Sequence, residues 1–267
     1  MTGDDHVLAR DLAGQAGRRL LDLRARGGDQ DVLRKAGDRL SHEFLTAELA
    51  ARRPGDVVLS EEGADNPARL GADRVWIVDP LDGTREFGEP GRTDWAVHVA
   101  LWERGDLTAL APGGTPPPGP PGKLAAGAVA LPAQDQILST AEPPPPRPDD
   151  EAPAKIRIVV SRSRPPQFVR NISGLIDAEL VSLGSAGAKV AAVVNGEVDA
   201  YVHGGGFYEW DTAAPVAVAR AAGLHASRID GSALAYNQAD LLMPDILVCR
   251  PALAGTLLRA IRDLKET

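Results

Sequence analysis

The feature that most constrains this 267-residue chain is a short apolar run that leads directly into two carboxylates. Residues 76–78 (Trp-Ile-Val) have the character of a buried strand, and Asp79-Pro80-Leu81-Asp82 follows without a break. Pro80 restricts the backbone between the aspartates, so that both side chains can be presented to one point. Like charges held so close repel each other, whereas a hard divalent cation binds carboxylate and carbonyl oxygens. The segment therefore predicts a metal site. A surface turn with acidic residues is the simpler alternative.

The residues after this segment, and two acidic positions elsewhere, extend the same prediction. Gly83 lets a phosphate approach the backbone, and the amides from Thr84 onward open a predicted helix that can bind phosphate oxygens. Glu61 follows a short apolar strand, and Asp211 lies in the first turn of a predicted helix. Simpler alternatives stay open for three of them: Glu61 as a solvated loop residue, Asp211 as a helix N-cap and Thr84 as a helix N-terminal residue.

The charge balance bears on the class of partner. Lys and Arg number 29 and Asp and Glu number 37, so the formal net charge is −8. Such a chain repels a nucleic-acid polymer, and an anionic substrate would need a local reversal of the field, which bound divalent cations supply. Cys249 is the only cysteine, and we find no apolar run of about 20 residues and no leader-like start. We expect a cytoplasmic protein without a membrane partner.

Hydrophobic periodicity predicts helices and strands that alternate in layers along the whole chain. The expected helices cover residues 5–24, 38–52, 166–177, 185–195 and 211–222. The expected strands cover residues 57–59, 74–79, 95–102, 123–131, 136–140, 156–160, 179–183 and 198–202.

Two proline-dense segments, residues 111–122 and 142–153, cannot join a strand ladder and are predicted to be mobile loops. The second is the expected domain boundary. It would separate an N-terminal α+β domain (1–154), which carries the acidic motifs, from a C-terminal α/β domain (155–267), which carries Asp211 and the substrate contacts.

Three motifs taken in order resemble a known family. SEEG at residues 60–63, WIVDPLDGT at 76–84 and EWDTAA at 209–214 are similar to the motifs of the inositol-monophosphatase superfamily of lithium-sensitive, magnesium-dependent phosphatases. GSAGAK at 184–189, VSRS at 160–163 and the DGTREF continuation resemble its 3'(2'),5'-bisphosphate nucleotidase branch. The resemblance implies an α/β class protein with the layered α/β/α/β/α sugar-phosphatase fold, and a family in which homodimers are frequent.

The resemblance also implies a set of ligands for two or three Mg²⁺ ions. Glu61, Asp79 and the Leu81 carbonyl match the ligands of one ion, and Asp79, Asp82 and Asp211 match those of a second. A third ion would lie near Glu61 and Asp38, an aspartate expected just before the second helix, which can also be a plain N-cap. Residues 31–37 depart from the family pattern ahead of Asp38, so the number of ions stays open.

The implied reaction is in-line attack of water on phosphorus. The ions would acidify that water and stabilise the leaving oxygen. Thr84 paired with Asp38, together with Glu61, would orient and deprotonate the water, while the amides of Gly83 and Thr84 hold the phosphate oxygens. His98 is expected to be an ordinary strand residue, since magnesium prefers oxygen ligands.

Substrate choice would depend on a second group of residues. Lys189, in the first turn of a helix that Ser185 can cap, is placed to meet a second phosphate, although it can also be a solvated helix residue. Residues 161–163 could add contacts. Arg85 either contacts the ligand or pairs with Glu86 or Glu89. The expected substrate-binding set is Leu81, Asp82, Gly83, Thr84, Arg85, Ser163, Ser185, Lys189 and Asp211.

These residues lead to one hypothesis and two alternatives. The first is removal of the 3'-phosphate from adenosine 3',5'-bisphosphate, or from its sulfated form, to give AMP or adenylyl sulfate in support of sulfur assimilation. The second is a monophosphatase for inositol, another small polyol or a pathway intermediate. The third is a sensor that keeps the fold without the chemistry. The expected partner is in each case a small phosphorylated metabolite.

Overall fold

The computed structural model describes residues 4–105, 120–145, 155–163 and 165–265. Most of the two proline-dense segments therefore lies outside the described residues, as does the predicted boundary at residue 154. The described elements form two five-stranded sheets and the helices that pack on them.

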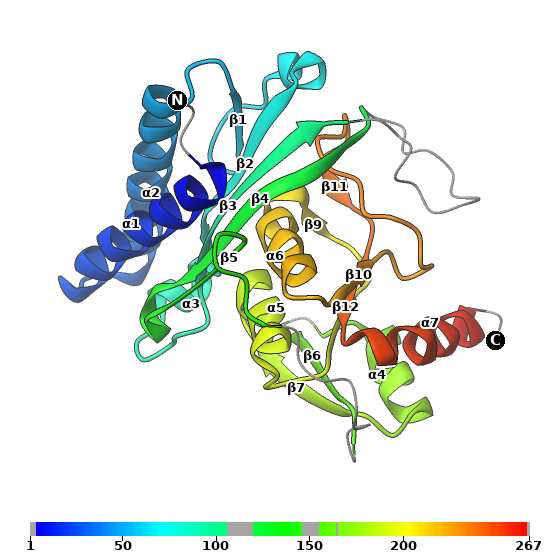
Figure 1. Cartoon of the computed structure of the whole chain (residues 1–267). Coiled ribbons are helices and arrows are strands. Elements are labelled where there is room, and N and C mark those ends of the chain that lie inside the picture. The colour runs from blue at the N-terminus through cyan, green and yellow to red at the C-terminus, as the bar shows by residue number, and fades with distance from the viewer. Residues whose placement is uncertain (1–3, 106–119, 146–154, 164, 266–267) are drawn as a thin grey trace.

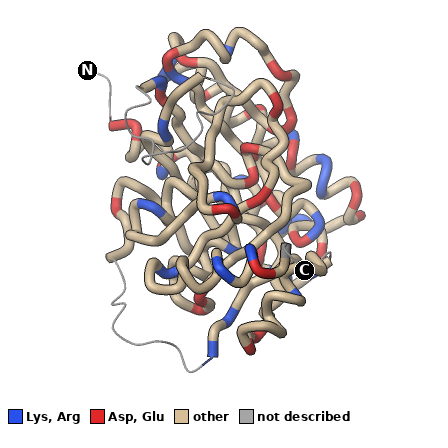
Figure 2. Tube along the Cα trace, turned by 90° about the vertical axis from the view of Figure 1, so that its right-hand side faces the viewer, with Lys and Arg blue, Asp and Glu red and all other residues tan. Residues whose placement is uncertain are grey.

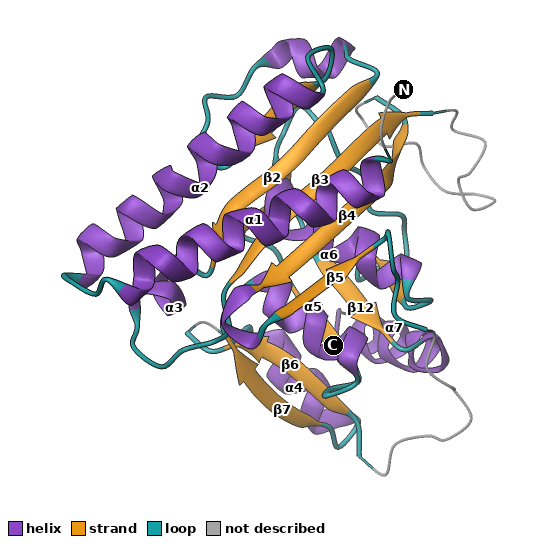
Figure 3. Ribbon diagram, turned by 60° about the vertical axis from the view of Figure 1, so that its left-hand side comes forward, coloured by secondary structure: helices purple, strands orange, loops and turns teal. Residues whose placement is uncertain are grey.

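The first sheet has the strand order β1-β2-β3-β4-β5. β1 and β2 are parallel, and each later neighbour is antiparallel. Two long helices, α1 and α2, lie across one face of this sheet (Figure 3). The strands are β1 (Val57–Ser60), β2 (Arg74–Asp82), β3 (Ala96–Arg104), β4 (Gly122–Leu131) and β5 (Gln136–Ser139), and the helices are α1 (Asp5–Ala25) and α2 (Gln30–Arg52).

The second sheet has the order β10-β12-β8-β6-β7. Helices α5 and α6 lie between the two sheets, and α4 and α7 cover the outer face of the second sheet (Figure 1). The strands are β6 (Arg157–Ser161), β7 (Glu179–Leu183), β8 (Ala200–His203), β10 (His225–Ser227) and β12 (Ile246–Cys249). The helices are α4 (Gln167–Leu175), α5 (Ala186–Asn195), α6 (Glu209–Ala221) and α7 (Pro251–Lys265).

Short elements complete the chain: η1 (Pro67–Gly71), α3 (Thr84–Gly88), η3 (Pro132–Gln134) and a two-stranded ribbon of β9 (Phe207–Tyr208) and β11 (Leu242–Met243). The result is the layered α/β/α/β/α arrangement that the resemblance implies.

Three separate cores hold the layers together, and β2 contributes to two of them. Trp76 and Val78 pack toward α1 and α2, while Val75 and Ile77 pack toward α5 and α6. All four side chains are fully buried. A strand covered on both faces has no reason to alternate apolar with polar residues, which explains why β2 appears in the sequence as one continuous apolar run.

Most predicted elements are confirmed, and two helix starts were wrong. α2 begins at Gln30, where the Asp29 side chain accepts hydrogen bonds from the amides of Asp31 and Val32. Asp38 is therefore an internal helix residue and neither precedes the helix nor caps it. The periodicity placed this start too late because half of residues 30–37 are polar and only Leu33 and Gly37 among them are buried.

The helix that carries Asp211 begins two residues earlier than expected, at Glu209, so Asp211 is not its N-cap. The short strands β9 to β12 were not predicted, because two to four residues carry too little periodicity to be recognised. Helix α7, with 15 residues, was also not predicted.

Charged residues of both signs are spread along the described part of the chain (Figure 2). Figure 2 shows Lys and Arg interspersed with Asp and Glu along the trace. Within the described ranges, no helix combines the length and the apolar character that a bilayer span requires.

Candidate active site

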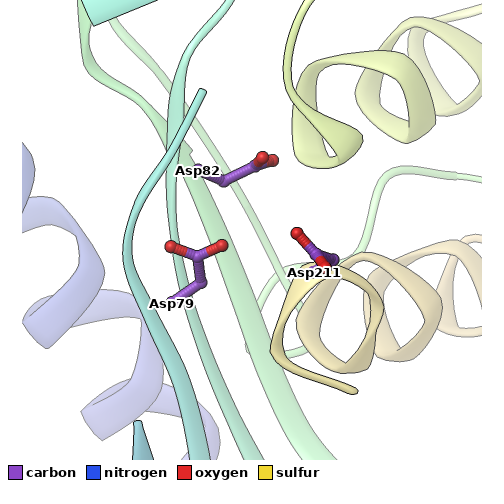
Figure 4. A group of neighbouring side chains, drawn as sticks. All are labelled: Asp79, Asp82 and Asp211. Atoms are coloured by element: carbon purple, nitrogen blue, oxygen red, sulfur yellow. The ribbon is translucent and has the colours of Figure 1, made fainter. Parts of the chain in front are cut away.

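An acidic cluster forms where the end of β2 meets the start of α6. One carboxylate oxygen from each of Asp79, Asp82 and Asp211 lies within 4.8 Å of the others, and the three side chains point into one space (Figure 4). Parallel pairing of β1 with β2 brings Glu61 to the same end, because its amide donates to the Val78 carbonyl at 3.3 Å. The structure thus assembles the predicted carboxylates from three elements that are distant in sequence.

The end of β2 is irregular, and this irregularity exposes both of its aspartates to the cluster. The pairing register of β2 with β3 shifts between Asp79 and Asp82, as expected where Pro80 removes a ladder donor. The amide of Leu81 donates to Asp79 Oδ1 at 3.0 Å and so fixes that side chain. Asp79 Oδ2 is buried and receives no hydrogen bond from any donor among the described residues.

Asp82 is held by donors on one of its two oxygens. Asp82 Oδ2 accepts from the Ser185 hydroxyl at 2.5 Å and from the Gly187 amide at 2.6 Å, and it lies 3.2 Å from His98 Nε2. Burial raises the pKa of this carboxyl, but His98, Lys189 and Ser185 together outweigh it and lower the pKa to about 2. Asp82 is therefore ionised, and its second oxygen is left for another ligand.

The neighbouring carboxyls have raised pKa values, in contrast to Asp82. Burial, followed by the negative charges of Glu61, Asp82 and Asp211, raises the pKa of Asp79 well above its usual range. Burial and the Asp82 charge raise the pKa of Asp211 to about 6. Glu61 is solvent-exposed at the rim, yet the protein around its carboxyl and the Asp211 charge raise its pKa to about 7.

The close approach of these carboxylates is electrostatically unfavourable without a cation, and their oxygens suit a divalent cation as ligands. Four carboxylates repel one another in a partly dry site, and the buried Asp79 Oδ2 lacks a donor. Oxygen-only ligands are those that hard divalent cations prefer. The acidic triad can therefore hold a metal ion.

Beside the cluster, Gly83 and Thr84 turn the chain from β2 into α3. Gly83 has a left-handed backbone (φ 84°), and a Cβ there would approach Ser185 Cβ to 3.1 Å, so glycine is required. Thr84 is the first residue of α3, and its hydroxyl lies 3.0 Å from the Leu81 carbonyl and 3.3 Å from Asp38 Oδ1. Burial and the Glu62 charge raise the pKa of Asp38 to about 6. The predicted Thr84–Asp38 contact is confirmed, even though Asp38 lies inside α2.

The loop before α5 supports the cluster from the other side. Ser185 caps α5 by accepting from the Ala188 amide at 3.0 Å, as predicted, with φ at 44°. Lys189 is buried, and its ammonium donates to the carbonyls of Gly184 at 3.1 Å and Ser185 at 2.6 Å. The alternative of a solvated Lys189 is therefore wrong.

Arg162 forms ion pairs with the two glutamates that follow Thr84. Its guanidinium contacts Glu86 at 2.8 Å and Glu89 at 3.0 Å, which joins the β6–α4 loop to α3. Glu86 and Glu89 thus pair with Arg162 across the two halves of the chain. Arg85 is exposed, as is Ser163.

His98 is the residue whose importance the sequence reasoning missed. It is a β3 residue as expected, but it is fully buried, with Nδ1 3.1 Å from the Trp210 carbonyl and Nε2 beside Asp82. It therefore bridges the end of β2 and the first turn of α6. A Cβ at Gly187 would overlap the imidazole, so the approach needs glycine. The signal was a lone polar residue in a strand that is apolar on both faces.

We expect His98→Leu to lower kcat/KM by about 10- to 100-fold and to weaken metal binding, because Asp82 loses a group that orients it. His98→Gln keeps an N–H donor and should recover part of the loss. Metal titration calorimetry beside steady-state kinetics measures both effects, with His225→Leu on β10 as the control. Unchanged metal affinity in His98→Leu would contradict the role.

Sequence comparison relates the chain to a described family and to two groups of named proteins. The model of the inositol monophosphatase family matches residues 10–266. A 3'-phosphoadenosine 5'-phosphate phosphatase of Mycobacterium leprae is 49% identical over 269 residues, covering 97% of this chain and 94% of that protein. The 3'(2'),5'-bisphosphate nucleotidase CysQ of Escherichia coli (strain K12) is 31% identical over 248 residues, covering 85% and 91%.

Solved structures show the same fold at lower identity. An inositol monophosphatase (II) of Staphylococcus aureus superposes with a TM-score of 0.74 at 20% identity, covering 95% of this chain and 93% of that one. The 2'AMP-bound SaIMPase-II gives 0.76 at 21% identity, with 97% of each chain covered. The order of motifs, the acidic cluster and these matches lead to one conclusion: the chain is a member of the inositol monophosphatase family.

Proposed function

We propose that this protein is a magnesium-dependent phosphatase that removes the 3'-phosphate of adenosine 3',5'-bisphosphate, and of 3'-phosphoadenylyl sulfate. The observation that carries the proposal is the carboxylate cluster, in which Asp82 is ionised beside groups whose pKa is raised. The name of the mycobacterial relative, at 49% identity over nearly the whole chain, supports the choice of substrate.

The residues present fit the cations that the reaction needs. Asp79, Asp82 and Asp211 would hold one Mg²⁺. Glu61, Asp79 and the Leu81 carbonyl would hold a second. Asp38, which contacts Thr84, would serve a third. When bound, such ions lower the pKa of water and stabilise the leaving oxygen.

The chain's own groups would orient the attacking water. Asp38, ionised at neutral pH, accepts a hydrogen bond from the Thr84 hydroxyl, which leaves a Thr84 lone pair to accept a hydrogen bond from water. Glu61, at the rim, can take up the proton that the attacking water loses, since the surrounding protein and the Asp211 charge raise its pKa to about 7. The water oxygen then forms a bond to phosphorus as the bond to the ribose 3'-oxygen breaks. That oxygen takes a proton from solvent, to which Glu61 returns the proton that it accepted. The amides of Gly83 and Thr84 would hold the phosphate oxygens.

The second phosphate would be recognised around the start of α5. Lys189 supplies a positive charge there and holds the Gly184 and Ser185 carbonyls inward, so that Ser185 stays in place. Ser163 and Arg85 are both exposed, and they would complete the contacts to this phosphate. This is the reason to expect a bisphosphorylated nucleotide in preference to a monophosphate.

The test is phosphate release from adenosine 3',5'-bisphosphate and from inositol monophosphate, measured in parallel with Mg²⁺ and with chelator. We expect release that requires Mg²⁺ and a kcat/KM at least about tenfold higher for the nucleotide, because a charged contact to the second phosphate strengthens binding. Preference for inositol phosphate would overturn the choice of substrate. No release from either would favour the non-catalytic sensor.

A further inference from the structure

An exposed aromatic residue has its backbone directly beside the acidic cluster. Tyr208 ends β9, and its backbone amide donates to Asp211 Oδ2 at 2.5 Å, so it is one hydrogen bond away from the candidate metal ligands. Its side chain nevertheless remains 43% exposed, which is unusual for an aromatic residue at the edge of a core. Across the ribbon its pairing partner, Leu242, is 50% exposed.

The Tyr208 ring packs against a neighbouring aromatic ring. It stacks on the Trp210 ring, with centroids 4.8 Å apart and planes 15° from parallel. Trp210 in turn is buried against the core between the sheets, and its carbonyl lies 3.1 Å from His98 Nδ1. One face of the Tyr208 ring is thus stacked on a buried indole, and the residue as a whole stays accessible to solvent.

We propose that the exposed Tyr208 ring stacks on the purine base of the nucleotide substrate. The base of a nucleoside 3'-phosphate is separated from the reacting phosphorus by one ribose ring. Tyr208 is close enough to the cluster for its backbone amide to donate a hydrogen bond to Asp211. Aromatic side chains bind bases in this way because every base has a π-face. A ring already stacked on Trp210 loses little rotamer freedom when the base arrives. This inference rests on the proposed function and specifies how the substrate class is recognised.

The test compares the 3',5'-bisphosphate of adenosine with its base-free analogue, methyl riboside 3,5-bisphosphate. Stacking should make kcat/KM for the nucleotide about 5- to 150-fold higher than for the analogue. Tyr208→Leu, which keeps an apolar side chain of moderate size but removes the π-face, should reduce that ratio toward one. Tyr208→Phe should preserve it, and Leu175→Ala, at an exposed apolar site on α4, is the surface control.

The outcomes separate this inference from the proposed function. If wild-type protein hydrolyses both substrates equally, or if Tyr208→Leu lowers both rates by the same factor, stacking on Tyr208 is wrong while the phosphatase activity stands. If wild-type protein hydrolyses neither, the proposed function fails. Circular dichroism of Tyr208→Leu checks that the ribbon and α6 remain folded, and Tyr208→Phe tests the same π-face should the leucine variant not fold.

Discussion

Asp79→Asn is expected to reduce kcat/KM for the proposed substrate by about 10³-fold. Asp79 is the one aspartate shared by both proposed ion sites, and its buried Oδ2 has no donor to satisfy it. A divalent cation contributes several kcal/mol to stabilising the transition state, and each 1.4 kcal/mol is about tenfold in rate. The variant should remain folded, because the amide keeps the shape of the side chain and relieves the repulsion in the cluster.

The matched control is Asp135→Asn, an exposed aspartate with a left-handed backbone that asparagine also tolerates. It removes a formal charge from an exposed turn that is not part of the acidic triad and should keep wild-type kinetics. Calorimetric titration with Mg²⁺ distinguishes a binding defect from a purely chemical one. Activity of Asp79→Asn within a few fold of wild type would exclude the cluster as the catalytic metal site.

The metal-free protein should become more stable as the pH falls from about 8 to about 5. Burial and neighbouring charge raise the pKa of Asp211 to about 6 from an ordinary value of 3.8, and they also raise the pKa of Asp79. A carboxyl whose folded pKa is raised binds a proton more tightly in the folded state. Its stabilising effect is complete below the unfolded pKa and is lost as the pH rises through the folded pKa.

Asp211 alone contributes about 1.4 kcal/mol over this range, because about one unit of its shift, between pH 6 and pH 5, is titrated there and each pKa unit is worth about 1.4 kcal/mol. His98, whose pKa is raised when the Asp82 charge and hydrogen bonding outweigh burial, acts in the same direction. His225 opposes it, since burial lowers its pKa. For a chain of this size we expect the unfolding midpoint to rise by roughly 3–6 °C.

Thermal unfolding at several pH values, with chelator and with saturating Mg²⁺, measures this linkage. Mg²⁺ needs ionised carboxylates, so its stabilising effect should grow with pH and flatten or reverse the trend. Asp82 does not enter this window, because its pKa is lowered to about 2. If the unfolding temperature of the metal-free protein instead decreases as the pH is lowered from 8 to 5, the carboxylates do not repel one another in the folded state.

Much of this protein could be predicted from local pattern. Features that depend on a few neighbouring residues were predicted correctly. They are the strand formed by a continuous apolar run, the end of α5 at Gly196 and the cap of α5 at Ser185. The acidic residues of the cluster could be named from the sequence, since a strand ending in closely spaced aspartates has few other uses.

The tertiary structure alone decided how those residues are tied together. Asp82 is ionised because Ser185, Gly187 and His98 approach it from other elements, at sequence separations that no local period encodes. Lys189 is buried because α5 lies between two sheets. The sequence determined which groups carry the chemistry, through local backbone and hydrophobic pattern. Packing between the layers decided their charge, their partners and the exposure of Tyr208, because burial and long-range contacts exist only once the layers meet.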